Sequence, residues 1–174
     1  ECRVVLAADP QAKLDELFDH YVERNFVTKA YQERLLENSV RRMLYRADTA
    51  IGTQYQQAKV GTEDFIVNFP FVRRTDQQID RIIKPLYLAQ DDPTRILTHG
   101  GQWVDKVKRL RKRCALPRHV LFPIAPPPEG SKAYPAYQEI CDDLMSADVE
   151  VVLAHDEASV VAFAGTIDLV AEQD

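Results

Sequence analysis

Hydrophobic residues along the chain recur with two different spacings, one typical of helices and the other of strands. Apolar side chains at helical spacing predict three helices, which are Lys29 to about Arg46, a segment that begins at Pro93 and stops at Pro117, and Tyr134–Ser146. In the run 64–72, DFIVNFPFV, large hydrophobes occupy alternate positions, which is the period of a strand. Helical and extended segments alternate along the chain, and this order predicts an α/β protein.

Five strands are expected in one mixed sheet. They are Gln54–Val60, Asp64–Val72, Ile79–Ala89, His119–Ile124 and Val149–Ala154. Short turns between the first three predict an antiparallel meander, and the crossover helices that follow return later strands parallel to the same sheet. Pro70 has no backbone N–H, so its strand is expected to be an edge, to be bulged or to end there.

The two ends of the chain are assigned with the same patterns. A strand Cys2–Ala7 and a helix that starts near Gln11 are expected in an N-terminal extension over residues 1–27. An α/β core domain is expected over residues 28–174. The stretch Ala158–Val170 suits a helix or a strand, and we interpret it as a helix.

The predicted order of elements, α-β-β-β-α-β over about Lys29–Ala154, resembles the core of the restriction-endonuclease-like superfamily. The resemblance implies an Asp on the second strand and a Glu-x-Lys on the third, where carboxylates hold a divalent metal beside the attacked phosphate. Here Asp64 opens the second strand and Lys84 takes the place of the lysine, but Ile82 stands where the acid belongs. Asp80 lies four residues before Lys84, about 13 Å along a strand.

Two interpretations of these residues stay open. Asp64, Asp80 and Lys84 form a displaced, metal-dependent nuclease site, or the fold is kept without a metal site. On the face that carries Lys84, the neighbours Ile82 and Leu86 are apolar. We therefore expect no two-carboxylate metal site around Lys84 and no cleavage of DNA.

Two further segments, 2–22 and 82–110, are similar to the C-terminal half of an uncharacterised bacterial protein family. Its members occur beside kinases that resemble the HipA toxin. The quoted residues are CRVVLAADPQAKLDELFDHYV and IIKPLYLAQ…THGGQWVDKVKRL. This resemblance implies no reaction. It implies a bacterial defence or mobile-element context and an N-terminal part that precedes Glu1.

The segment Trp103–Arg113, WVDKVKRLRKR, is predicted to form a helix with an apolar sector and a basic sector. Trp103 belongs to the apolar sector and is expected in the core, packed with Val107 and Leu86. Several cations on one helix can neutralise phosphates, which favours nucleic-acid binding, although a solvated helix face has the same pattern. The candidate nucleic-acid contacts are Lys106, Arg109, Lys112 and Arg113, with Arg73 and Arg74 from a strand turn.

The motif His99-Gly100-Gly101 is the most distinctive one around a histidine. Glycines let a backbone approach a ligand closely, but they also break helices, and here they predict a kink or two helical pieces. Neither a Gly-x-Gly-x-x-Gly motif nor a Walker lysine pattern is present, so no cofactor is expected.

Charge and composition narrow the choice of function. Up to Ala115 the chain has 20 Lys and Arg against 16 Asp and Glu, and from Leu116 it has 2 against 11. Such asymmetry is found in proteins with a nucleic-acid face on one half. No window reaches the roughly 18–20 continuous apolar residues of a membrane span, so no membrane partner is expected. Three cysteines without C-x-x-C spacing favour a reducing cytoplasm over a disulfide framework or a zinc site.

The sequence thus predicts a non-catalytic, nuclease-like domain that binds nucleic acid or a partner protein in the cytoplasm. The alternatives are the displaced metal-dependent nuclease and a protein-interaction module of the toxin–antitoxin type, which would use the acidic C-terminal part. Steep salt dependence would separate binding to nucleic acid from binding to protein.

Overall fold

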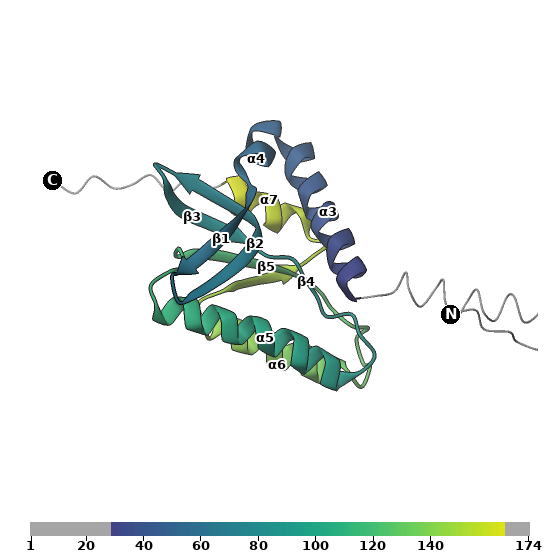
Figure 1. Cartoon of the computed structure of the whole chain (residues 1–174). Coiled ribbons are helices and arrows are strands. Elements are labelled where there is room, and N and C mark those ends of the chain that lie inside the picture. The colour runs from purple at the N-terminus through teal and green to yellow at the C-terminus, as the bar shows by residue number, and fades with distance from the viewer. Residues whose placement is uncertain (1–28, 166–174) are drawn as a thin grey trace, which may run out of the picture.

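A computed structural model describes residues 29–165, and the predicted elements before and after this range lie outside the described residues. The helices α3 (Lys29–Ala47), α4 (Thr49–Gln54) and α7 (Glu157–Gly165) cover one face of a central sheet. The helices α5 (Pro93–Lys112) and α6 (Tyr134–Met145) cover the other face (Figure 1). The chain therefore folds into three layers, and the predicted α/β class is confirmed.

The sheet is mixed, as the pattern of strands predicts. Its strands are β1 (Gln56–Thr62), β2 (Phe65–Thr75), β3 (Gln78–Ile83), β4 (Leu86–Tyr87), β5 (His119–Ala125) and β6 (Glu150–Leu153). β1, β2 and β3 form the antiparallel meander, and β3, β4 and β6 all pair with β5 in parallel. Crossovers through α5 and α6 return the chain to this sheet, which confirms the expected connections. The restriction-endonuclease-like assignment itself stays a prediction.

Three predicted strand boundaries are wrong, each for a local reason. Gly61-Thr62 extends β1, and the turn falls instead at Glu63-Asp64, so Asp64 does not belong to β2. The expected polar turn 73–77 is shorter, because β2 continues through Thr75. Both residues of the remaining turn, Asp76 and Gln77, have positive φ angles of 50° and 67°, as a tight hairpin turn requires.

The third meander strand is not one strand over Ile79–Ala89 but two. β3 ends at Ile83, and β4 begins at Leu86, with Lys84-Pro85 between them. Pro85 cannot donate a ladder hydrogen bond, which separates the two pieces. Lys84 therefore lies between the two strands, directly after the end of β3.

Pro70 lies inside β2, which is flanked on both sides and is not an edge strand. Gln56 pairs with Val72 but Ala58 pairs with Phe69, so β2 has one residue more than β1 in this interval. This is a β-bulge, the second of the three outcomes expected for a proline. The bulge accommodates the missing N–H within a central strand.

The helix α5 is continuous over 20 residues, so the predicted alternative of two helical pieces at Gly100-Gly101 is wrong. Asp92 caps its first turn by accepting a hydrogen bond from the N–H of Thr94 at 2.9 Å. Seven of its residues are buried, and α6 packs along it (Figure 1). Tertiary packing of this kind outweighs the low helix propensity of two glycines.

Two apolar cores lie on opposite faces of the sheet. The larger one joins the sheet to α5 and α6, and the smaller one joins it to α3 and α7. Trp103 is 8% exposed and belongs to the larger core with Val107 and Leu86, which confirms its predicted place. Its ring lies against those of Phe69 and Phe122, with centroids 5.7 and 6.0 Å away. Within residues 29–165, no helix is both long enough and apolar enough to span a bilayer.

Candidate functional site

The three residues of the displaced nuclease site are held apart by the sheet. Asp64 lies exposed in the β1–β2 turn. Lys84 follows Ile83, which pairs with Phe71, and Asp64 is seven residues before Phe71, about 20 Å of extended strand. Asp80 binds Arg73 across the meander, accepting from Nε at 2.9 Å and Nη2 at 2.5 Å. Among the described residues, no group of three or more His, Cys, Asp or Glu side chains could hold a metal ion.

Lys84 is instead part of a cluster of polar contacts that joins α3, the end of β3 and α5. Its side chain is almost fully buried, and Nζ donates to Oε1 of Glu37 at 3.0 Å. The same Nζ lies 5.0 Å from the centre of the Trp103 ring. A buried ammonium needs such partners, because its desolvation costs several kcal/mol unless a counter-charge offsets it. Ile82, the residue in place of the expected acid, is fully buried among apolar side chains.

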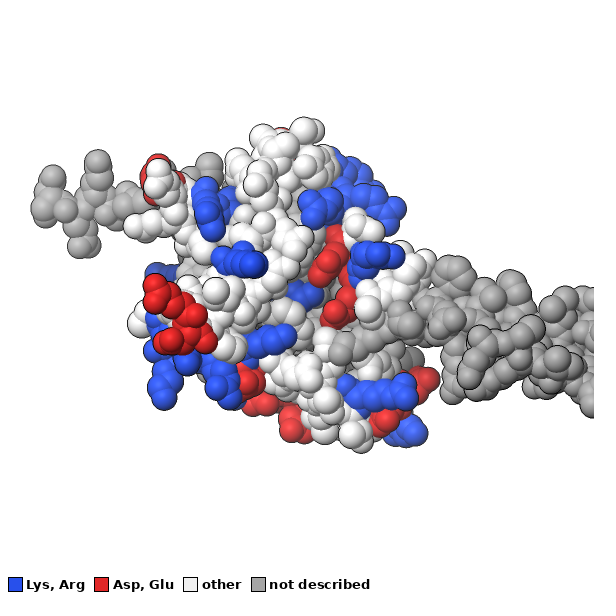
Figure 2. Space-filling view, viewed as in Figure 1, with Lys and Arg blue, Asp and Glu red and all other residues white. Residues whose placement is uncertain are grey.

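A second polar contact, between Glu33 and His99, lies one helical turn away. Glu33 precedes Glu37 by four residues, so both carboxylates lie on the same face of α3. Oε1 of Glu33 lies 2.5 Å from Nε2 of His99, which is 5% exposed. The other ring nitrogen, Nδ1, is buried without a hydrogen-bond partner among the described residues. In the space-filling view, acidic and basic side chains lie side by side below α3 (Figure 2).

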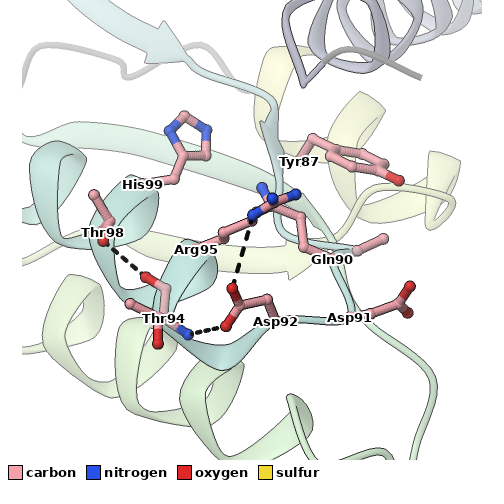
Figure 3. Close-up of a pocket in the computed structure, with 9 residues that line it drawn as sticks. Tyr87, Gln90, Asp91, Asp92, Thr94, Arg95, Thr98 and His99 are labelled. Carbon is pink, nitrogen blue, oxygen red and sulfur yellow. Dashed lines mark hydrogen bonds and ion pairs between the residues drawn. The ribbon is translucent and has the colours of Figure 1, made fainter. Parts of the chain in front are cut away.

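His99 also lines a pocket of about 440 Å³ at the start of α5. This pocket lies beyond the carboxyl ends of the parallel strands, where open α/β sheets commonly bind ligands. Figure 3 shows its polar side chains, which come from α5, from β4 and from the connection between them. Burial, and then the charge of Asp91, raise the pKa of Tyr87, so its hydroxyl is a donor at neutral pH. The lining residues are Tyr87, Ala89, Gln90, Asp91, Asp92, Thr94, Arg95, Thr98 and His99.

Three of the predicted phosphate contacts lie along one side of α5. Lys106, Arg109 and Arg113 are three and four residues apart, which places them on the same side of a helix. Nζ of Lys106 lies 4.4 Å from the centre of the Trp103 ring, and the guanidinium of Arg113 lies 5.5 Å from that of Phe65. These three cations are called the α5 stripe below.

Arg109 has an acidic neighbour on the same helix. Its Nε donates to Oδ2 of Asp105 at 2.7 Å, and this hydrogen bond raises the pKa of the guanidinium. Both side chains are more than half exposed, so the pair contributes little and can exchange for another anion. Basic side chains gather over α5 on the face shown in Figure 2, with acidic ones between them.

The other predicted phosphate contacts, Arg73, Arg74 and Lys112, are not part of the α5 stripe. Arg73 is 6% exposed, bound to Asp80, and donates from Nη1 to the carbonyl oxygen of Ala164 at 2.8 Å, so it holds β2 to α7. Such a buried guanidinium is not available to a phosphate. Arg74 is exposed at the end of β2, and Lys112 is exposed in the last turn of α5.

Sequence analysis missed Glu33, Glu37, Tyr87 and Gln90. The only local signal was the i, i+4 spacing of the two glutamates, which is common on solvated helices. Their partners are 66 and 47 residues away, and no periodicity encodes such contacts. The sequence did point to His99, but because of the two glycines that follow it and not because of its contact with Glu33.

No protein-family model, curated protein or solved structure matches this chain.

Proposed function

We propose that this domain binds nucleic acid through the α5 stripe and does not cleave it. The observation that carries the proposal is the alignment of Lys106, Arg109 and Arg113 along one side of α5. The first and last are seven positions apart, or about 10 Å along the helix axis, so the three can contact neighbouring phosphates of one strand. The bacterial defence or mobile-element setting rests on the family resemblance alone.

The acidic groups near the stripe do not compensate its charge fully. Asp105 is the acid that pairs with Arg109, while no acidic partner within residues 29–165 binds Lys106 or Arg113 in the structure. Stripe cations that lack a fixed carboxylate can neutralise phosphates and release counterions.

The environment of Lys84 supports the second half of the proposal. A metal-dependent nuclease needs carboxylates that converge on a metal beside the lysine. In this fold Lys84 is bound to Glu37, Asp80 is bound to Arg73, and Ile82 has no ligand atom to offer. Of the three groups of the displaced site, Asp80 and Lys84 are therefore bound to other side chains, and Asp64 lies in the distant β1–β2 turn.

The test is binding of a fluorescein-labelled DNA duplex, followed by anisotropy over a series of salt concentrations. Each phosphate contact adds about 0.9 to the slope of log K against log salt, so the variant Lys106→Gln/Arg109→Gln/Arg113→Gln should lower the slope by about 2.7. The control removes three exposed cations from other elements, Arg34→Gln/Arg42→Gln/Lys132→Gln, and should change the slope much less.

Three outcomes would overturn the proposal. Absence of salt-sensitive binding would favour the protein-interaction module. Equal losses in the two triple variants would mean that general charge, and not the α5 stripe, attracts DNA. Cleavage of the duplex with Mg²⁺ or Mn²⁺ that stops in Lys84→Ala or Asp64→Ala would establish the displaced nuclease.

A further inference from the structure

We propose that the pocket at the start of α5 holds one nucleotide, with its base against Tyr87 and the edge of the base at Gln90 and His99. The proposal rests on the proposed function, because it assigns to the same face of α5 a place for an unpaired nucleotide. The pocket is named the α5 pocket below. Its volume, about 440 Å³, is in the range that small ligands occupy.

Two buried polar atoms of the α5 pocket have no hydrogen-bond partner among the described residues. They are Nδ1 of His99 and Nε2 of Gln90. The carboxylate of Glu33 accepts from Nε2 of His99, so in the neutral ring Nδ1 is left as an acceptor. The amide nitrogen of Gln90 is a donor. Buried polar groups without partners are costly, and a ligand that supplies both a donor and an acceptor would satisfy them.

A nucleobase has this combination of groups. Its edge presents donors and acceptors side by side, and its face stacks on aromatic side chains. Tyr87 supplies the aromatic ring, half-buried in the wall of the α5 pocket (Figure 3). Unpaired bases are commonly recognised by stacking on such rings together with hydrogen bonds to their edges.

The charges around the α5 pocket favour a base over a bare phosphate. Asp91 and Asp92 line it, and their carboxylates repel an anion that would enter. Arg95 is the cation of this rim. Its side chain is 78% exposed, and Nε is 3.7 Å from Oδ2 of Asp92, a long and replaceable contact. A nucleotide fits this distribution of charge, because its uncharged base would lie inside, beside the two aspartates, and its phosphate would lie outside, next to Arg95.

The α5 pocket lies on the same side of the helix as the α5 stripe. At about 100° per residue, the eleven residues from Arg95 to Lys106 amount to three turns and only about 20° more. The axial separation is about 16 Å, and a stacked strand rises about 3.4 Å per nucleotide, so about five nucleotides bridge the two. A strand held by Lys106, Arg109 and Arg113 can therefore reach the α5 pocket with an unpaired end.

The experiment compares a blunt duplex with the same duplex carrying a five-nucleotide overhang, both by anisotropy at one salt concentration. Stacking of one base on an aromatic side chain predicts about five- to hundredfold tighter binding of the overhang. Tyr87→Ala and Gln90→Leu should remove this preference and leave the affinity for the blunt duplex within about twofold. Tyr134→Ala, on α6, removes a ring outside the α5 pocket and should keep the preference.

A second experiment measures the binding of adenosine monophosphate and of cytidine monophosphate alone. Binding is followed by NMR through the side-chain amide signals of Gln90. Binding of a mononucleotide without any overhang preference would retain the α5 pocket as a nucleotide site, but with a free nucleotide as its ligand. If neither the overhang nor a mononucleotide binds the α5 pocket, the inference is wrong. Salt-sensitive binding of the blunt duplex would in that case still support the proposed function, so the two failures are distinguishable.

Discussion

Two adjacent glycines inside α5 have opposite surroundings, and this difference leads to a quantitative prediction. A Cβ atom added at Gly100 would lie 2.6 Å from both Cγ1 and Cγ2 of Ile140 on α6. At Gly101 an added Cβ would meet no atom within 4 Å. Gly100 thus permits the close approach of α5 to α6, while Gly101 has no packing role in the structure.

The expected magnitudes follow from helix propensity and packing. Alanine is about 1 kcal/mol more favourable than glycine inside a helix, so Gly101→Ala should stabilise the protein by about that amount. Gly100→Ala gains the same propensity, but the overlap with Ile140 must be relieved, and overpacking costs about 1–3 kcal/mol. Gly100→Ala should therefore be about 1–3 kcal/mol less stable than Gly101→Ala.

Equilibrium unfolding in urea, followed by circular dichroism, measures both free energies of unfolding. Ile140→Ala provides the control, because it removes the atoms that the new Cβ would meet. In that background Gly100→Ala should become stabilising by about 1 kcal/mol, which makes the coupling energy of the cycle about 1–3 kcal/mol. Equal stability of the two glycine variants, or additive behaviour of Gly100→Ala and Ile140→Ala, would refute the packing argument.

Three other side chains have testable roles. Trp103→Ala should lower the free energy of unfolding by about 3–5 kcal/mol, measured in urea, and a loss below 1 kcal/mol would place the ring outside the core. Arg73→Met should cost about 3 kcal/mol because it leaves Asp80 partly buried without its counter-charge, and Arg73→Met/Asp80→Asn should recover part of that loss. Hydrogen bonds from Ser159 lower the pKa of Asp156, so the stability that Asp156 adds over Asp156→Asn should be complete above about pH 5 and fade as the pH falls through the lowered pKa. A difference that grows on acidification would contradict this last prediction.

The mixed sheet could be predicted because local patterns and the tertiary structure agree. The alternation of Phe65, Val67, Phe69 and Phe71 marks a strand, and the last three of these side chains are buried in the structure. Val67 and Phe69 belong to the larger core, whereas Phe71, beyond the start of the bulge, belongs to the smaller core on the opposite face. Short polar turns then leave few topologies other than an antiparallel meander. The bulge at Pro70 was predictable for the same reason, since a missing N–H has only local consequences.

The errors arise where tertiary contacts outweigh local preference. Gly100-Gly101 should interrupt a helix by propensity, but burial of α5 against the sheet and α6 keeps it continuous. The strand expected over Ile79–Ala89 breaks at Lys84-Pro85, where the lysine turns toward Glu37. Pro85 is a local signal for the strand break, but the continuity of α5 cannot be derived from the residues within one turn of the glycines. The same limit hid Glu33 and Glu37, which are brought to the site only by the packing of α3.

Two buried polar contacts link α3 to the elements beside the α5 pocket. Glu33–His99 joins α3 to α5, whose His99 lines the pocket, and Glu37–Lys84 joins α3 to the end of β3. Buried ion pairs add little net stability over apolar residues of the same size, but breaking one is costly, so they fix geometry more than they stabilise a fold. Lys84 is therefore best understood as a positioning residue, which links the end of β3 to α3. Binding at the exposed side of α5 would then depend on these pairs indirectly, through the placement of His99 and of the helix that carries the cations.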